Sequence, residues 1–169
     1  MVDVQLAQNK RYINCITIDA TDTFCYCGTR AGDILEIFIE NASYKRTGPV
    51  HKIFRGGIHQ INAAFGDGLI ISTAAGTLAR VNKKSMLFEE EVDLQGGPIV
   101  SLTNSVEKIY ALNASGSLNS VEGTTNLANV SCFTTSMTDP VSSICFPAGF
   151  GEIFAVRIRD EIRLWNVAD

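Results

Sequence analysis

The side chains best suited to chemistry in this sequence are two histidines, His51 and His59, and five cysteines. Zinc sites hold such ligands at short, regular spacings, and no pair of histidine or cysteine residues has one here. Cys25 and Cys27 lie one residue apart in an apolar run that reads as a strand, where cysteine packs as a small hydrophobe. We therefore expect no metal, and we interpret the cysteines as reduced thiols of a cytosolic protein.

Motifs for phosphate binding and acyl transfer are also missing. The stretch Gly28-Thr29-Arg30-Ala31-Gly32 imitates a phosphate loop, but no Lys-Ser/Thr pair follows its glycines. No Gly-x-Ser-x-Gly nucleophile turn occurs. We expect no catalytic residue, no cofactor and no enzyme activity, and the two glycines are explained by the geometry of a hairpin turn.

The sharpest charged run is Glu89-Glu90-Glu91. It could contact a basic patch on a partner protein. The alternative is a solvated strand edge, because runs of like charge usually face water.

These residues are carried by a phrase that recurs four times. Three copies open with glycine, at Gly32–Ile37, Gly76–Val81 and Gly116–Val121, and the fourth, Asp160–Trp165, has lost it. The copies start 44, 40 and 44 residues apart. A turn glycine that opens an alternating strand about every 40 residues is typical of stacked β-propeller blades. The predicted fold is therefore an all-β segment of about four blades, a class of fold that usually forms interaction surfaces.

Each blade should contain three inner strands and one outer strand. The expected inner strands are 12–18, 24–27 and 34–37; 58–63, 69–72 and 78–81; 99–102, 109–112 and 118–121; and 141–146, 153–156 and 162–165. Outer strands are expected at 52–54, 91–94 and 132–134, with 2–6 as a further one. Alternatively, Leu87, Phe88, Glu91 and Val92 could share one face of a helix. The blades then cover 11–54, 58–94, 98–134 and 140–167 of a single domain, 1–169.

Composition narrows the class of protein further. The chain has 169 residues, of which 46% are hydrophobic and 19% charged, as in a globular domain. Its net charge of −4 argues against nucleic acid as a partner, because phosphate binding needs a basic excess. No signal peptide and no apolar run long enough for a membrane helix occur, so we expect no membrane association.

Four blades are half of a typical propeller. Such a piece leaves the last blade incomplete and two blade faces uncovered, which is an aggregation hazard unless they are capped. We therefore expect either missing blades from a longer chain or a second copy that completes the ring.

Several stretches resemble one known family in order and at matching spacing. These stretches are Phe24–Leu35, Val92–Ile99, Val141–Pro147 with Glu152–Ala155, and Asp160–Trp165. They are similar to the cilia- and flagella-associated protein 52 family of WD-repeat propellers. The resemblance implies a non-catalytic scaffold in the cytoskeleton of cilia and flagella, which stabilises axonemal doublet microtubules through tubulin or axonemal proteins. An alternative for this fold is a peptide-reading adaptor in signalling or ubiquitin transfer, with Arg30 or Arg159 as an anchor.

Propeller geometry also predicts which loops share a face. Loops from outer to inner strands, and from second to third strands, gather on the narrow face, and the candidate partner-binding residues there are Arg30, Arg55, His59, Asp139, Arg159 and Asp160. The opposite face would carry Lys45, Arg46, Lys83, Lys84 and Lys108. Clustered arginines can grip carboxylates of acidic peptides or tubulin. The alternative is that these charges only keep ordinary loops soluble.

Overall fold

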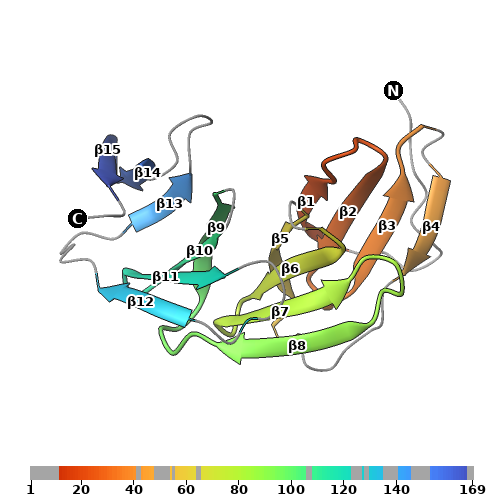
Figure 1. The fold of residues 1–169 in the computed structure, drawn as a ribbon, viewed down its shortest axis with the longest axis horizontal. Helices are drawn as coiled ribbons and strands as arrows, with labels where there is room; N and C mark the ends of the chain where they lie inside the picture. Colours follow the sequence, from red (N-terminus) through yellow and green to blue (C-terminus); the bar gives the residue numbers. More distant parts are fainter. Residues whose placement is uncertain are drawn as a thin grey trace.

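The computed structural model describes residues 12–40, 43–47, 54, 56–63, 66–105, 108–122, 127, 130–134, 141–145 and 153–166. This part of the chain contains strands and no helix, which confirms the predicted all-β fold. The strands form four separate antiparallel sheets, here called blades 1 to 4, and each sheet follows chain order. Figure 1 shows the blades fanning in an open array, with the two end blades on either side of its gap.

Within the described residues, three blades have four strands and the last has three. Blade 1 contains β1 (Ile13–Ile18), β2 (Phe24–Thr29), β3 (Ile34–Phe38) and β4 (Ser43–Thr47). Blade 2 contains β5 (Ile58–Asn62), β6 (Gly68–Thr73), β7 (Thr77–Asn82) and β8 (Phe88–Asp93). Blade 3 contains β9 (Ile99–Asn104), β10 (Lys108–Asn113), β11 (Ser117–Glu122) and β12 (Val130–Thr134). Blade 4 contains β13 (Val141–Cys145), β14 (Ile153–Ile158) and β15 (Glu161–Asn166).

The inner strands β1, β5, β9 and β13 lie side by side from blade to blade. Hydrogen bonds join them at repeat spacing: Asn14 Nδ2 donates to the Ile58 carbonyl at 3.0 Å, and Asn62 Nδ2 donates to Asn104 Oδ1 at 2.7 Å. Residues 44 and 42 positions apart are thereby in contact. The sequence repeat is therefore also a spatial repeat.

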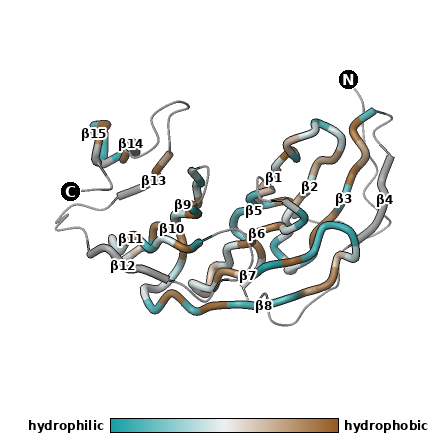
Figure 2. Tube along the Cα trace, viewed as in Figure 1, coloured by the Kyte–Doolittle hydropathy of each residue, from teal (hydrophilic) through white to brown (hydrophobic). Residues whose placement is uncertain are grey.

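Burial between blades explains the apolar second strands. All six residues of β6 are buried, as expected for a strand covered on both faces by neighbouring blades. One core lies between blades 1 and 2 and includes Tyr26, Ile34 and Ile71; the next includes Ile70, Leu78 and Ile109. Figure 2 shows hydrophobic stretches in the strands of every blade.

The repeated glycine closes the turn between the second and third strands. Gly76 has φ 94°, and its N–H donates to the Thr73 carbonyl at 3.2 Å. Positive φ is easy for glycine and costly for other residues. In blade 4, which lacks the glycine, Arg159 adopts φ 50° in the corresponding turn.

Two expectations about the outer strands are corrected. The strand paired with β3 is β4, so the outer strand of blade 1 is not at 52–54; Lys52 and Ile53 lie outside the described residues, and Phe54 is buried in the first core. The helical alternative for residues 87–92 is wrong, because β8 pairs with β7 along its length. The expected strand at 2–6 lies outside the described residues.

Candidate functional site

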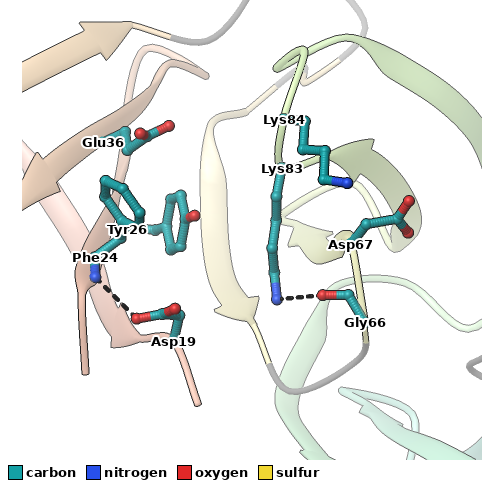
Figure 3. A pocket seen from close by; sticks show the side chains of 8 residues that line it. All are labelled: Asp19, Phe24, Tyr26, Glu36, Gly66, Asp67, Lys83 and Lys84. Atoms are coloured by element: carbon teal, nitrogen blue, oxygen red, sulfur yellow. Dashed lines mark hydrogen bonds between the residues drawn. The ribbon is translucent and has the colours of Figure 1, made fainter. Parts of the chain in front are cut away.

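A pocket opens between blades 1 and 2, at the end of the blades where β1 turns into β2 (Figure 3). It encloses about 560 Å³. The described residues that line it are Asp19, Phe24, Tyr26, Glu36, Gly66, Asp67, Lys83 and Lys84. Blade 1 supplies the aromatic rings and two carboxylates, and blade 2 supplies both lysines.

The aromatic wall follows from the alternation of β2. Phe24 and Tyr26 are two residues apart on that strand, so they share the face that packs on blade 2. Their ring centroids are 6.5 Å apart, and the Phe24 ring also lies 5.7 Å from that of Phe38. Tyr26 is buried and Phe24 is half-buried, so the wall is held firmly by the core behind it.

Asp19 is fixed by the turn it makes. Its carboxylate accepts hydrogen bonds from the backbone N–H groups of Thr23 at 2.9 Å and Phe24 at 2.8 Å, and from the Thr21 hydroxyl at 2.5 Å. Slight desolvation raises the pKa of Asp19, but these hydrogen bonds to the charged form outweigh it and lower the pKa below 3.8. The carboxylate is therefore a stationary negative charge at the pocket.

Lys83 is fixed from the other side. Its Nζ donates to the carbonyls of Ala63 at 2.6 Å and Gly66 at 2.9 Å, which ties the β7–β8 turn to the β5–β6 loop. Burial lowers the pKa of Lys83, while the charges of Asp19 and Asp67 act in the opposite direction. Lys84, by contrast, is exposed at the rim.

The lining of the pocket offers charged and aromatic groups that suit recognition. Its described lining has three carboxylates, two amines and one phenol, and contains no serine, cysteine or histidine that could act as a nucleophile with a base. Opposite charges stand beside an aromatic wall, an arrangement that can bind charged or polar side chains of another protein. Because its groups are already held by hydrogen bonds, little ordering entropy is lost on binding.

Of the six residues chosen from sequence, the four that lie in the described part of the chain do not line this pocket. Arg55 and Asp139 lie outside the described residues. Arg30, Arg159 and Asp160 are exposed in turns between second and third strands, at the opposite end of the blades from the pocket. His59 is exposed near the start of β5, toward the same end as Arg30. These four residues are spread over blades 1, 2 and 4, and whether they bind a partner stays a prediction.

Lys83 and Lys84 are predicted from sequence to lie on the face opposite the candidate set. In the structure both lysines line the pocket between blades 1 and 2. Asp19, in the turn between β1 and β2, supplies part of the pocket and was not among the candidate binding residues. The sequence signal that could have indicated the pocket was the alternation of Phe24 and Tyr26 in β2. It did not reveal that the β7–β8 turn of the next blade lies across from them.

Two other features, a metal cluster and a membrane-spanning helix, are absent from the described residues. No group of three or more His, Cys, Asp or Glu residues is arranged to hold a metal ion within that part of the chain. The described segments also contain no helix with the length and hydropathy of a membrane span.

Comparison with known proteins confirms the resemblance to the cilia- and flagella-associated protein 52 family. The chain is 28% identical over 165 residues to the protein named Cilia- and flagella-associated protein 52 of Sus scrofa, and 28% identical over 166 residues to that of Homo sapiens. It is 26% identical over 173 residues to that of Chlamydomonas reinhardtii. These alignments cover 97–98% of this chain and 26–27% of each relative. The chain thus spans about a quarter of the length of these relatives, whose names denote no enzyme. No family model matches the chain.

Solved structures support the fold. The computationally designed Ika4 protein superposes with a TM-score of 0.76 at 12% identity, covering 99% of both chains. U3-55K superposes with a TM-score of 0.72 at 10% identity, covering 95% of this chain and 54% of its own. At these identities the likeness concerns the fold alone, and it agrees with an open array of propeller blades.

Proposed function

We propose that this chain is a non-catalytic, protein-binding scaffold of cilia and flagella, where it contributes to axonemal doublet microtubules by contacting tubulin or a neighbouring axonemal protein. The shared name of its relatives, which associates them with cilia and flagella, supports this location. Its mechanism is rigid presentation, in which blade cores hold the loops still and binding costs little ordering entropy.

The observation that carries the proposal is the fixed charge of the pocket between blades 1 and 2. Asp19 is held by three hydrogen bonds and Lys83 by two, so both charges are in place before a partner arrives. Exposed Lys84 extends this surface to the rim, where it can meet a carboxylate of the partner.

A peptide-reading adaptor is the second candidate. It is favoured by the same pocket, because about 560 Å³ beside an aromatic wall can accept one or two side chains of a peptide. The two functions differ in how binding energy is distributed. An adaptor depends on one compact site, whereas a scaffold spreads its contacts and tolerates single substitutions.

Co-sedimentation with polymerised tubulin tests the scaffold. We expect the chain to pellet with the polymer and to be released as salt rises, because exposed charges are screened. Lys84→Glu tests the pocket end, and Arg30→Ala with Arg159→Ala tests the opposite end. Arg163→Ala, at an exposed position away from both, is the matched control. Partial loss with each test variant supports a scaffold, and complete loss with one alone supports the adaptor. If the chain neither pellets with tubulin nor binds purified axonemal proteins, the scaffold proposal is overturned.

A further inference from the structure

The blade 1 wall of the pocket is acidic and aromatic. Of the described residues that line the pocket, blade 1 contributes Asp19, Phe24, Tyr26 and Glu36. Glu36 on β3 pairs with Tyr26 on β2, so both side chains lie on the face of blade 1 that meets blade 2. The Asp19 carboxylate is bonded to the N–H of Phe24, and Figure 3 shows the two rings between Glu36 and Asp19. This wall is therefore complementary to a positive charge.

Glu36 places an acid where its own face of β3 is otherwise apolar. Its neighbours on that face are Ile34, which is fully buried in the first core, and Phe38, whose ring lies 5.7 Å from that of Phe24. Glu36 itself is only 5% exposed. A carboxylate buried among apolar groups is costly unless cations or hydrogen-bond donors accompany it. Glu36 has contacts of its own within the chain, and a carboxylate with about four acceptor sites can accept from an incoming donor beside them.

The blade 2 wall leaves the described lining with an excess of acids. The Lys83 ammonium is held by the carbonyls of Ala63 and Gly66, which belong to its own blade. Lys84 and Asp67 carry opposite charges, and both are exposed at the rim. Of the five charged side chains in the described lining, three are negative, and the most buried of the five is an acid.

The next blade shows that this place in the repeat can hold a guanidinium. Arg80 in blade 2 is equivalent to Glu36 in blade 1, because each stands four positions after its turn glycine. The Arg80 side chain is 11% exposed and lies between Glu89 Oε2, 2.7 Å from its Nε, and Asp67 Oδ1, 3.2 Å from its Nη2. Blade 2 therefore fills the place with a cation between two acids, whereas blade 1 has an acid at the equivalent position.

We propose that the pocket between blades 1 and 2 receives an arginine side chain of the partner protein, an inference that rests on the proposed function. The guanidinium lies against the rings of Phe24 and Tyr26, within reach of the negative charges of Glu36 and Asp19. Arginine fits this wall better than lysine, because its planar and weakly hydrated cation stacks on aromatic faces. Lys84 at the rim can then meet an acidic side chain of the same segment.

An NMR titration of the isotope-labelled chain tests the pocket with a defined probe. The probe is a short capped peptide of glycine and serine with one central arginine. We expect saturable shifts of the Thr23 and Phe24 amides, which are bonded to Asp19, and of the Lys84 amide. Replacing the arginine by citrulline, which has nearly the same shape but no charge, should weaken binding at least about tenfold.

Four variants locate the site on the chain. Glu36→Gln should weaken binding of the arginine peptide at least about tenfold, and Phe24→Leu about two- to fivefold through loss of the ring contact. Glu91→Gln, at an exposed position on β8, is the matched control and should leave the dissociation constant unchanged. Lys84→Gln should strengthen binding about twofold, because it removes a like charge at the rim. Circular dichroism checks that every variant is folded.

The inference is overturned if the citrulline peptide binds as well as the arginine peptide, or if Glu36→Gln leaves binding intact. A peptide with a central glutamate that shifts the same amides more strongly also overturns it. So does a chain that binds tubulin or axonemal proteins while the arginine peptide leaves these amides unshifted. Failure of the proposed function is distinct: the chain then binds neither tubulin nor axonemal proteins, although the arginine peptide still occupies the pocket.

Discussion

Arg80 on β7 and Glu89 on β8 form a charged pair across the outer edge of blade 2. The Arg80 Nε donates to Glu89 Oε2 at 2.7 Å, and its Nη2 lies 3.2 Å from Asp67 Oδ1 at the pocket. The Arg80 side chain is only 11% exposed, so its guanidinium is partly desolvated. The neighbouring Glu90 accepts a hydrogen bond from the Leu127 N–H at 2.8 Å. Two of the three consecutive acids are thus engaged within the chain.

Glu89→Gln should lower the free energy of unfolding by about 1 kcal/mol, because it removes a partly exposed ion pair. The loss should shrink in high salt, since screening already weakens the pair in the native chain. Urea unfolding at low and high salt measures both effects. Glu91→Gln, at an exposed position on the same strand, is the control. Equal losses from the two substitutions would show that the pair with Arg80 adds nothing.

Gly76→Ala should destabilise the chain more than Gly66→Ala. Both glycines have positive φ, 94° and 41°, so alanine pays for backbone strain at each position. A Cβ on Gly76 would also overlap the carbonyl oxygen of Gly97, whereas a Cβ on Gly66 meets nothing within 4 Å. We expect a loss of about 1 kcal/mol at Gly66 and at least about 2 kcal/mol more at Gly76. If Gly76→Ala and Gly66→Ala have similar midpoints in urea unfolding, Gly76 and Gly97 do not approach each other this closely.

The inner strands could be predicted because strands that are buried between two blades have apolar sequences. The apolar run at 69–72 lies in β6, which is buried on both faces, and the glycines at 32, 76 and 116 mark turns that require positive φ. Local sequence carries both signals. The prediction of stacked blades therefore followed from the local strand pattern, the turn glycines and their spacing.

The outer strand of blade 1 and the pocket were not predictable in the same way. β4 reads Ser-Tyr-Lys-Arg-Thr, which lacks the apolar alternation that indicates a strand, whereas 52–54 contains the apolar pair Ile53 and Phe54. The pocket joins Phe24 and Tyr26 to Lys83 across two blades. Such a site depends on how the blades pack, and no pattern within one repeat encodes it.

Asn113 links the third blade to the loop before it, and its removal should be costly. The side chain is buried, its Nδ2 donates to the Gly97 carbonyl at 2.8 Å, and its Oδ1 accepts from Asn119 Nδ2 at 2.7 Å. Asn113→Ala leaves two polar groups without these partners, so we expect a loss of about 2–4 kcal/mol in the free energy of unfolding. Ser115→Ala, at an exposed position in the adjacent turn, should change it by less than about 0.5 kcal/mol.

A double-mutant cycle separates the hydrogen bond from general disruption. Asn119→Leu in the Asn113→Ala background should cost less than Asn119→Leu alone, because its partner is already absent. Strict additivity of the two losses would mean that the 2.7 Å contact contributes no coupling energy.

Stability should fall as pH rises above 9, because two thiols stay protonated in the folded chain. Burial raises the pKa of Cys15 from 9.0 to about 11, and burial together with the neighbouring Cys25 thiol raises the pKa of Cys27 to about 12. Between pH 9 and 11 the unfolded chain loses these protons and the folded chain keeps them. Since the folded state then binds more protons, the free energy of unfolding decreases with pH, and the contribution is fully present only below pH 9.

Cys27→Ala should make this decrease shallower, whatever it does to stability at neutral pH, because one of the two retained protons is removed. The measurement is urea unfolding at several pH values from 7 to about 10.5, in the presence of a reductant. Cys145→Ala, at an exposed thiol, is the matched control and should keep the slope of the native chain. Comparing slopes cancels the lysines and tyrosines that titrate in the same range. If Cys27→Ala and the native chain lose stability at the same rate above pH 9, the buried thiol does not hold its proton as its position between β1 and β3 implies.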